Sequence, residues 1–200
     1  MFFYVVYAIV WPIFHLLFPY KIIGKEKLRG QKQGYVLCAN HISLVDPVYL
    51  VYALTRKNRI HIMAKGELFK NKLLGWFFTH VGAFPVNRGV GAQALKNATK
   101  VLEDGNALMI FPEGTRSKDG NLGRGKMGAA MLVNAVDTYV LPVSIVTKNQ
   151  KVRVFRKTTL IVGDPIIMPA QGEKTHREHL KECTNIIMNA IGEGLNWNEQ

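Results

Sequence analysis

The fold is decided by residues 34–46, which read GYVLCANHISLVD and pass from an apolar run into a polar turn. Tyr35 to Ala39 has the length and composition of a strand, and the apolar stretch 48–54 beyond the turn has the character of a helix. Strands that lead through a short turn into a helix are typical of α/β proteins. The segment therefore predicts an α/β fold with His41 at a strand end, where open α/β sheets place ligand sites.

The rest of the chain continues this alternation. Five more apolar runs of strand length lie at 60–64, 81–86, 107–111, 140–146 and 158–162. Residues 93–104 form an amphipathic pattern that stops at Gly105, and Thr175 and Glu178 have the spacing of a capping box at the start of a C-terminal helix. We predict one mixed, mostly parallel central sheet wrapped by helices. Pro142 indicates that its strand is an edge or bulged strand.

Residues 1–20 carry no formally charged side chain. As a helix they would extend about 30 Å, the thickness of the hydrocarbon core of a bilayer. Pro12 and His15 allow a kinked or half-inserted helix as well as a straight span, and an N-terminal helix packed on a soluble core is a further alternative. We predict a membrane-associated segment at 1–22 followed by one domain at 23–200.

The composition is strongly basic, with 26 Lys and Arg against 14 Asp and Glu and a formal net charge of +12. Such a charge attracts nucleic acid, an anionic membrane or a phosphorylated substrate. Basic side chains follow the apolar segment directly, at Lys21, Lys25, Lys27, Arg29 and Lys32. This order favours the cytoplasmic side of a membrane, so we expect the domain to lie on the cytoplasmic face of the cell membrane.

The cysteines and histidines indicate neither a disulfide framework nor a metal site. Cys38 and Cys183 lie far apart in apolar surroundings, and we expect Cys38 to be buried and inert. Of the six histidines, only His176 and His179 share a helix face, and we expect both to be solvated. No bound metal or cofactor is expected.

A His and an Asp five residues apart across a strand-to-helix turn can approach closely. The Asp46 carboxylate would hold one ring nitrogen of His41 protonated, while the other takes a proton from a substrate hydroxyl. An alternative of equal weight treats Ser43 and Asp46 as a helix cap and His41 as a turn residue.

Two further segments carry polar side chains suited to a phosphate. Arg88 ends an apolar strand between Asn and Gly, and a guanidinium can bind two oxygens at once. Residues 111–117 read FPEGTRS and place Glu113, Thr115 and Arg116 on one loop, where they could build a polar pocket. Taken singly, a solvated strand end and an ordinary turn explain these segments as well.

Together and in this order, these segments resemble the blocks of the glycerolipid acyltransferase family: Asn-His-x4-Asp, a strand ending in Arg, Phe-Pro-Glu-Gly-Thr-Arg-Ser and a Pro-containing apolar strand. The resemblance covers residues 34–145, and the bacterial 1-acyl-sn-glycerol-3-phosphate acyltransferases match best. It implies a glycerol-3-phosphate acyltransferase-like fold. The implied reaction moves an acyl group from acyl carrier protein or coenzyme A to the sn-2 hydroxyl of lysophosphatidic acid. The product would be phosphatidic acid for phospholipid biosynthesis.

The resemblance also implies roles for single residues. His41 would be the general base and Asp46 its orienting partner. The glycerol phosphate would be bound by Arg88, Glu113, Gly114, Thr115 and Arg116. One departure is Gly125, because the family often has an aromatic residue just before Lys126, and the shape of the acyl pocket is open at this point.

Two alternatives remain at the level of sequence, and two further classes are disfavoured. The acceptor could be glycerol-3-phosphate or another lysophospholipid. A non-catalytic protein that binds membrane or an anionic ligand would explain the charge but leave His41 and Asp46 without a role. A nucleic-acid partner would not need the apolar N-terminus, and no Gly-x-Ser-x-Gly segment supports a hydrolase. The apolar run 73–78 either docks on lipid or forms a core helix.

Overall fold

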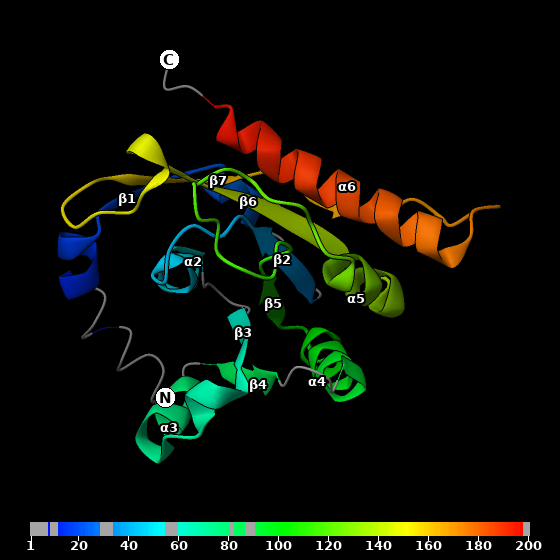
Figure 1. Ribbon diagram of the computed structural model, residues 1–200, viewed down its shortest axis with the longest axis horizontal. Helices are drawn as coiled ribbons and strands as arrows, with labels where there is room; N and C mark the ends of the chain where they lie inside the picture. The colour runs from blue at the N-terminus through cyan, green and yellow to red at the C-terminus, as the bar shows by residue number, and fades with distance from the viewer. Residues whose placement is uncertain are drawn as a thin grey trace.

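A computed structural model describes residues 8, 12–28, 34–54, 60–80, 82–86 and 91–197 (Figure 1). Its centre is an eight-stranded sheet with the order β1-β7-β6-β2-β5-β3-β4, in which β8 pairs with β6. The strands are β1 (Tyr20–Ile23), β2 (Tyr35–Ala39), β3 (Ile60–Lys65), β4 (Ala83–Val86), β5 (Ala107–Ile110), β6 (Tyr139–Thr147), β7 (Thr158–Val162) and β8 (Ile166–Ile167). Pairing is parallel except between β6 and β7 and between β6 and β8. The predicted mixed, mostly parallel sheet is confirmed.

Helices connect and cover the strands. They are α2 (Asp46–Leu54), α3 (Lys72–His80), α4 (Gly91–Glu103), α5 (Gly128–Val136) and α6 (His176–Leu195), with short 3-10 turns η1 (Lys25–Leu28), η2 (Gly66–Phe69) and η3 (Lys148–Gln150). The predicted capping box starts α6: the Thr175 hydroxyl accepts from the Glu178 N–H, and the Glu178 carboxylate accepts from the Thr175 N–H.

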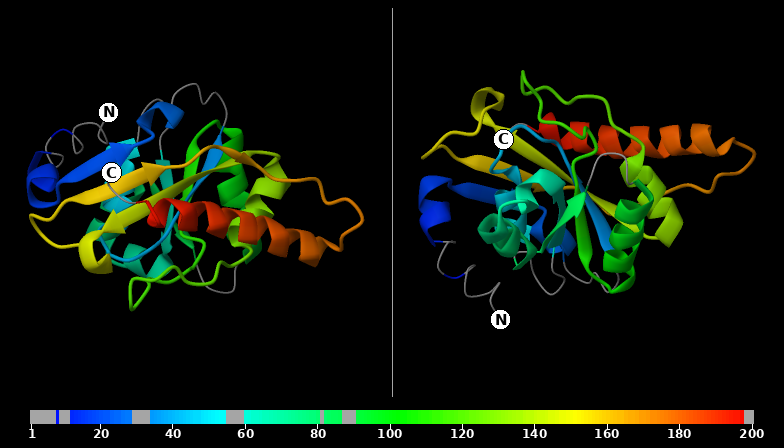
Figure 2. Two further views of the ribbon diagram at one scale, coloured as in Figure 1. Left: turned by 90° about the horizontal axis from the view of Figure 1, so that it is seen from above. Right: turned by 60° about the horizontal axis from the view of Figure 1, so that its bottom comes forward.

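The helices form a layer on each face of the sheet. All five residues of β2 are buried, and alternate side chains point to opposite faces. Leu37 packs in a cluster with α2, whereas Val36 and Cys38 pack in a second cluster with α4, α5 and α6. Figure 2 shows α6, in red, lying along the sheet on this second face. A strand covered on both faces explains why β2 reads as a continuous apolar run.

The expectation of an edge strand at Pro142 is wrong, because β6 pairs with β2 on one side and with β7 and β8 on the other. The alternative of a bulged position agrees with the pairing, because the three steps from Val140 to Val143 face the four steps from Val162 to Ile166. β8 pairs with Tyr139 and Val140, and β7 pairs from Val143 onward, so Pro142 lies between the two. Its carbonyl accepts from the Gly163 N–H at 2.9 Å on that side. Pro142 stands opposite Gly163 in the register of β7, so the proline lacks only the reciprocal bond to the Gly163 carbonyl, at the end of that ladder.

The N-terminal segment is described only in part, since 1–7 and 9–11 lie outside the described residues. Residues 12–17 are helical, and Phe14 is buried against Tyr49, with ring centroids 5.2 Å apart. Strand β1 begins at Tyr20, so the sheet starts within the segment 1–22 that the sequence assigns to the membrane. Among the residues the structure describes, no helix is both long enough and apolar enough to cross a membrane.

The exposure of individual side chains corrects the prediction for His179 and qualifies the prediction of a core helix at 73–78. His179 is only 4% exposed and lies 3.6 Å from the Cys183 sulfur through Nε2, so the expectation that it is solvated is wrong. His179 lies on the buried face of α6, which packs against the rest of the domain. Burial raises the pKa of the Cys38 thiol, as expected for an inert core cysteine. On α3, Leu73 is 75% and Trp76 49% exposed, so this helix does not bury its whole apolar run.

Candidate active site

The sheet brings the first and third polar segments together. Strands β2 and β5 are parallel neighbours, so the loops that follow their carboxyl ends leave from the same edge. His41 follows the end of β2, and Phe111 follows the end of β5. The two rings stack with centroids 4.0 Å apart and an interplanar angle of 17°. Phe111 therefore fixes the plane of the imidazole.

The Asp46 carboxylate orients the His41 ring. Its Oδ2 lies 2.8 Å from His41 Nδ1, and the same oxygen accepts from the N–H groups of Ile42 and Ser43 at 2.7 Å each. Asp46 is completely buried, at the first residue of α2. The carboxylate that closes the turn before the helix also contacts the histidine, so a helix cap and the predicted approach of Asp46 to His41 are compatible.

This contact decides which ring nitrogen carries a proton. A carboxylate can only accept, so Nδ1 holds the hydrogen in the neutral ring and Nε2 presents a lone pair. The His41 side chain is 16% exposed, and within the described part of the chain only Asp46 hydrogen-bonds to the ring. The arrangement can accept a proton from a hydroxyl bound beside Nε2.

Glu113 joins the loop after β5 to the loop that carries His41 and also ties its own loop together. One carboxylate oxygen accepts from the His41 N–H and the other from the Gly123 N–H, both at 2.9 Å. The residue is 6% exposed. The same loop also donates from the Ser117 N–H to the His41 carbonyl at 2.7 Å. Both oxygens of Glu113 therefore hold backbone, and the polar loop is attached to the histidine at two points.

The other residues predicted to bind substrate are exposed on a loop or lie outside the described residues. Gly114, Thr115 and Arg116 are exposed on the loop that carries Glu113. Gly114 has a φ of +71°, and a Cβ there would lie 2.7 Å from Lys126 Nζ, so a side chain would be strained and crowded. Arg88 lies outside the described residues.

Asn40 is a positioning residue that the sequence did not single out. It is 2% exposed, and its side chain amide accepts from the Ile145 N–H at 2.7 Å and donates to the Ile145 carbonyl at 3.1 Å. It fixes the carboxyl half of β6 beside the histidine loop. In the sequence it is a polar side chain that ends an apolar run and the first residue of the Asn-His-x4-Asp block, but no role was assigned to it.

A cavity opens beside these residues. Its volume is about 320 Å³, and its walls include Asn40, Ile42, Leu122, Ile145, Thr147 and Leu195. Asn40 and Ile42 are the two chain neighbours of His41, so the cavity borders the histidine loop. Its walls are partly apolar and partly polar.

Helix α6 fills the space next to Gly125. A Cβ on Gly125 would lie 2.6 Å from Met188 Cγ and 2.8 Å from Thr184 Cγ2. The glycine therefore lets α6 pack closely where the resembled family often has an aromatic side chain. We expect Gly125→Phe to lower the free energy of unfolding by about 1–3 kcal/mol through overpacking. Thermal unfolding measures this loss.

Gly128→Phe is the matched control, because nothing lies within 4 Å of a Cβ at Gly128. Its unfolding midpoint should stay close to that of the wild type. Equal midpoints for the two variants would contradict the close approach of α6 to Gly125.

The structure is an α/β domain with a partly buried His-Asp contact at the carboxyl edge of its sheet, an arrangement typical of enzymes. The family model described as Acyltransferase matches residues 20–146. The chain belongs to the acyltransferase family. It is thus a transferase, and a purely non-catalytic binding protein is set aside.

Particular relatives share one activity name. The chain is 32% identical over 177 residues to the 1-acyl-sn-glycerol-3-phosphate acyltransferase of Bacillus subtilis, with 86% of each chain covered. It is 35% identical over 121 residues to the protein of the same name from Streptococcus pneumoniae, covering 60% of this chain and 44% of that one. The crystal structure of the 1-acyl-sn-glycerophosphate acyltransferase PlsC from Thermotoga maritima superposes with a TM-score of 0.69 at 23% identity. It covers 98% of this chain and 81% of that one, and it supports the fold.

Proposed function

We propose that this chain transfers a fatty acyl group from an acyl carrier protein or coenzyme A thioester to the sn-2 hydroxyl of 1-acylglycerol-3-phosphate. The observation that carries the proposal is the 2.8 Å contact between His41 Nδ1 and Asp46 at the carboxyl edge of the sheet. The activity name shared by the relatives supports this acceptor. The product is phosphatidic acid, the precursor of phospholipids.

In this reaction His41 acts as the general base. Asp46 keeps the proton on Nδ1, and Nε2 takes the proton of the acceptor hydroxyl as its oxygen attacks the thioester carbonyl carbon. The new C–O bond forms, the C–S bond breaks, and the thiolate leaves with the proton from the imidazolium. A thioester is already activated, so the direct attack needs no acyl-enzyme.

The phosphate of the acceptor is bound by Arg88 and Arg116, with Thr115 and the backbone at Gly114 adding donors. The location of Arg116 supports this role. Its side chain is exposed on the loop that also carries Glu113, and Glu113 accepts from the His41 N–H. Glu113 contributes by positioning, since both of its oxygens accept from backbone N–H groups. A phosphate bound on this loop lies near the base.

Replacing Arg116 by Ala is expected to raise the KM for lysophosphatidic acid about 10–100-fold with a smaller change in kcat, because a charge-assisted hydrogen bond to the phosphate is lost. Arg88→Ala should act in the same direction. Steady-state rates over a range of acceptor concentrations measure both. The control is Arg177→Ala, an exposed arginine on α6. An unchanged KM in both site variants would remove the two arginines from the phosphate site.

The test of the acceptor is a competition. Labelled acyl thioester is supplied with lysophosphatidic acid, glycerol-3-phosphate or another lysophospholipid in lipid vesicles, and the products are separated. Phosphatidic acid should be the main product. Transfer to glycerol-3-phosphate alone would keep the reaction and overturn the acceptor. Using acyl carrier protein and coenzyme A thioesters in parallel identifies the donor.

We propose that the enzyme works at the cytoplasmic face of the cell membrane. The net charge of +12 and the uncharged segment 1–20 support a location beside anionic lipid. Both its acceptor and its product are membrane lipids, which favours the same location.

A further inference from the structure

The connection between β6 and β7 concentrates positive charge. Residues 148–157 read KNQKVRVFRK, with five cations and no acidic residue. They line a hollow of about 200 Å³ whose wall also includes Thr147 and Thr158. The five cations that line it are Lys148, Lys151, Arg153, Arg156 and Lys157. The hollow therefore suits an anion such as a phosphodiester.

The same segment exposes apolar side chains among these cations. Val154 is 49% and Phe155 69% exposed. Phe155 has a φ of +60°, a conformation that is rare for an aromatic residue and costs free energy. Stability alone gives no reason to keep an exposed ring in this conformation.

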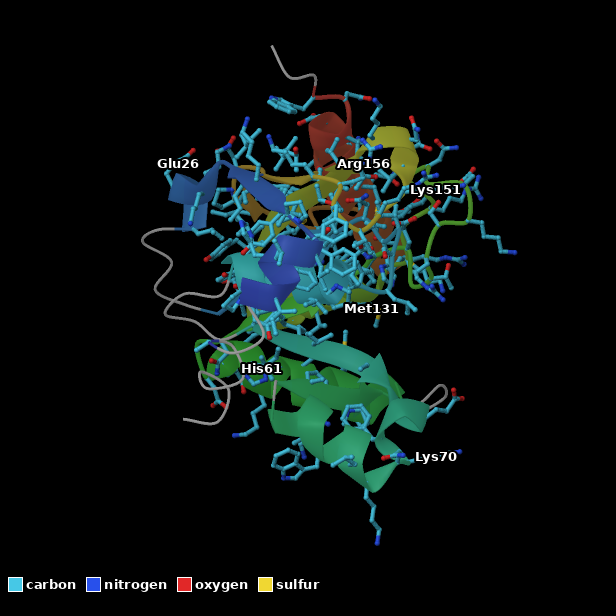
Figure 3. All side chains as sticks on the ribbon, turned by 90° about the vertical axis from the view of Figure 1, so that its left-hand side faces the viewer. Glu26, His61, Lys70, Met131, Lys151 and Arg156 are labelled. Carbon is cyan, nitrogen blue, oxygen red and sulfur yellow. The ribbon has the colours of Figure 1, made fainter. Side chains whose placement is uncertain are left out.

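A short apolar helix lies beside the loop. Its residues Ile13 and Leu16 are 58% and 70% exposed. The Phe155 N–H donates to the Leu17 carbonyl at 2.7 Å and the Thr158 N–H to the Pro19 carbonyl at 3.0 Å, so the helical segment 12–17 is tied to the loop. In Figure 3, Arg156 is labelled above and to the right of this segment, which is drawn in blue. Cations and exposed apolar side chains therefore share one side of the molecule.

We propose that residues 148–157 and the helical segment 12–17 form a docking surface for an anionic lipid bilayer. The basic hollow takes lipid phosphates, while Phe155 and Leu16 enter the boundary between headgroups and acyl chains. An acidic protein would also be attracted by the cations. The bilayer is favoured because the apolar helix continues an N-terminus that has no charged residue before Lys21.

The docking surface lies next to the cavity that borders the histidine loop. Thr147 lines both the basic hollow and the cavity that also contains Asn40 and Ile42. Binding the bilayer through this surface would bring the cavity close to the headgroup layer.

The first test removes two charges from the full-length protein and measures partition onto vesicles by sedimentation. Lys151→Gln with Arg156→Gln should weaken partition onto phosphatidylglycerol-containing vesicles about 30-fold. It should change binding to pure phosphatidylcholine vesicles much less. The matched control is Lys181→Gln with Arg177→Gln, two exposed cations on α6. Equal losses in both double variants would overturn the proposal, because net charge alone would then explain binding.

The second test separates docking from folding. Phe155→Gly removes the ring and suits the positive φ, so the thermal unfolding midpoint should stay equal or rise. Partition onto anionic vesicles should fall about tenfold. A lower midpoint with unchanged partition would show that the ring is structural and contradict the proposal.

Neither test depends on catalysis, so its failure would leave the proposed acyl transfer untouched. A Lys151→Gln, Arg156→Gln variant that partitions like the wild type, but has a raised KM for acyl carrier protein thioester in detergent, would overturn lipid docking in favour of a protein partner.

Discussion

His41→Ala is expected to lower the rate of acyl transfer to lysophosphatidic acid by about 10²–10⁴-fold, the usual contribution of a positioned general base. The reason lies in the geometry, because Asp46 holds Nδ1 at 2.8 Å and Phe111 stacks on the ring at 4.0 Å, so that Nε2 is the only ring atom left to accept a proton. The initial rate of product formation in vesicles, at saturating acceptor, measures the loss.

His176→Ala is the matched control, since His176 is an exposed histidine at the start of α6. It should keep the wild-type rate. Asp46→Asn should also lower the rate, because a neutral amide can still accept through its oxygen from Ile42, Ser43 and His41 but no longer stabilises the imidazolium that forms when Nε2 takes the proton. Full activity in His41→Ala would remove the histidine from the reaction.

Glu113→Gln is expected to lower the free energy of unfolding by about 2–4 kcal/mol, although the side chain keeps its shape. One of the two carboxylate oxygens becomes an amide nitrogen, which leaves the N–H of His41 or of Gly123 buried without an acceptor and facing another donor. The midpoint of thermal unfolding should fall by roughly 5–15 °C for a chain of this size. The transfer rate should fall as well, because the backbone of His41 is no longer held.

Glu193→Gln, an exposed glutamate on α6, provides the comparison and should unfold like the wild type. A Glu113→Gln protein with wild-type stability and only a raised KM for the acceptor would show that the carboxylate contacts substrate. That outcome would contradict its role in joining the loops.

Much of the sheet could be predicted from apolar runs bounded by polar turns. Strands β2 and β7 have the predicted bounds, because their side chains are almost all buried. Strand β1 was missed because its four residues include exposed Lys21 and follow directly on an apolar segment. Strand β8 has only two residues and shows no periodicity. The edge position predicted for β6 was wrong, because a proline can also occupy a central strand where the pairing on one side shifts by one residue.

The candidate site was predictable where its contacts are local. His41 and Asp46 are five residues apart, and the turn between them fixes their approach. Glu113 accepts from an N–H 72 residues away, and Asn40 binds backbone 105 residues away. Every non-proline residue offers the same backbone N–H, so the sequence carries no mark of such partners. The fold alone shows that these polar residues hold the site together.

The most direct test of the central claim is chemical rescue of His41→Gly. The rate of phosphatidic acid formation from labelled acyl thioester and lysophosphatidic acid is measured for the wild type and for the variant, with and without added imidazole. If His41 is the base, the wild type is active, the variant has almost no activity, and imidazole restores part of it in a concentration-dependent way. A folded His41→Gly protein that keeps the wild-type rate without imidazole would contradict the account.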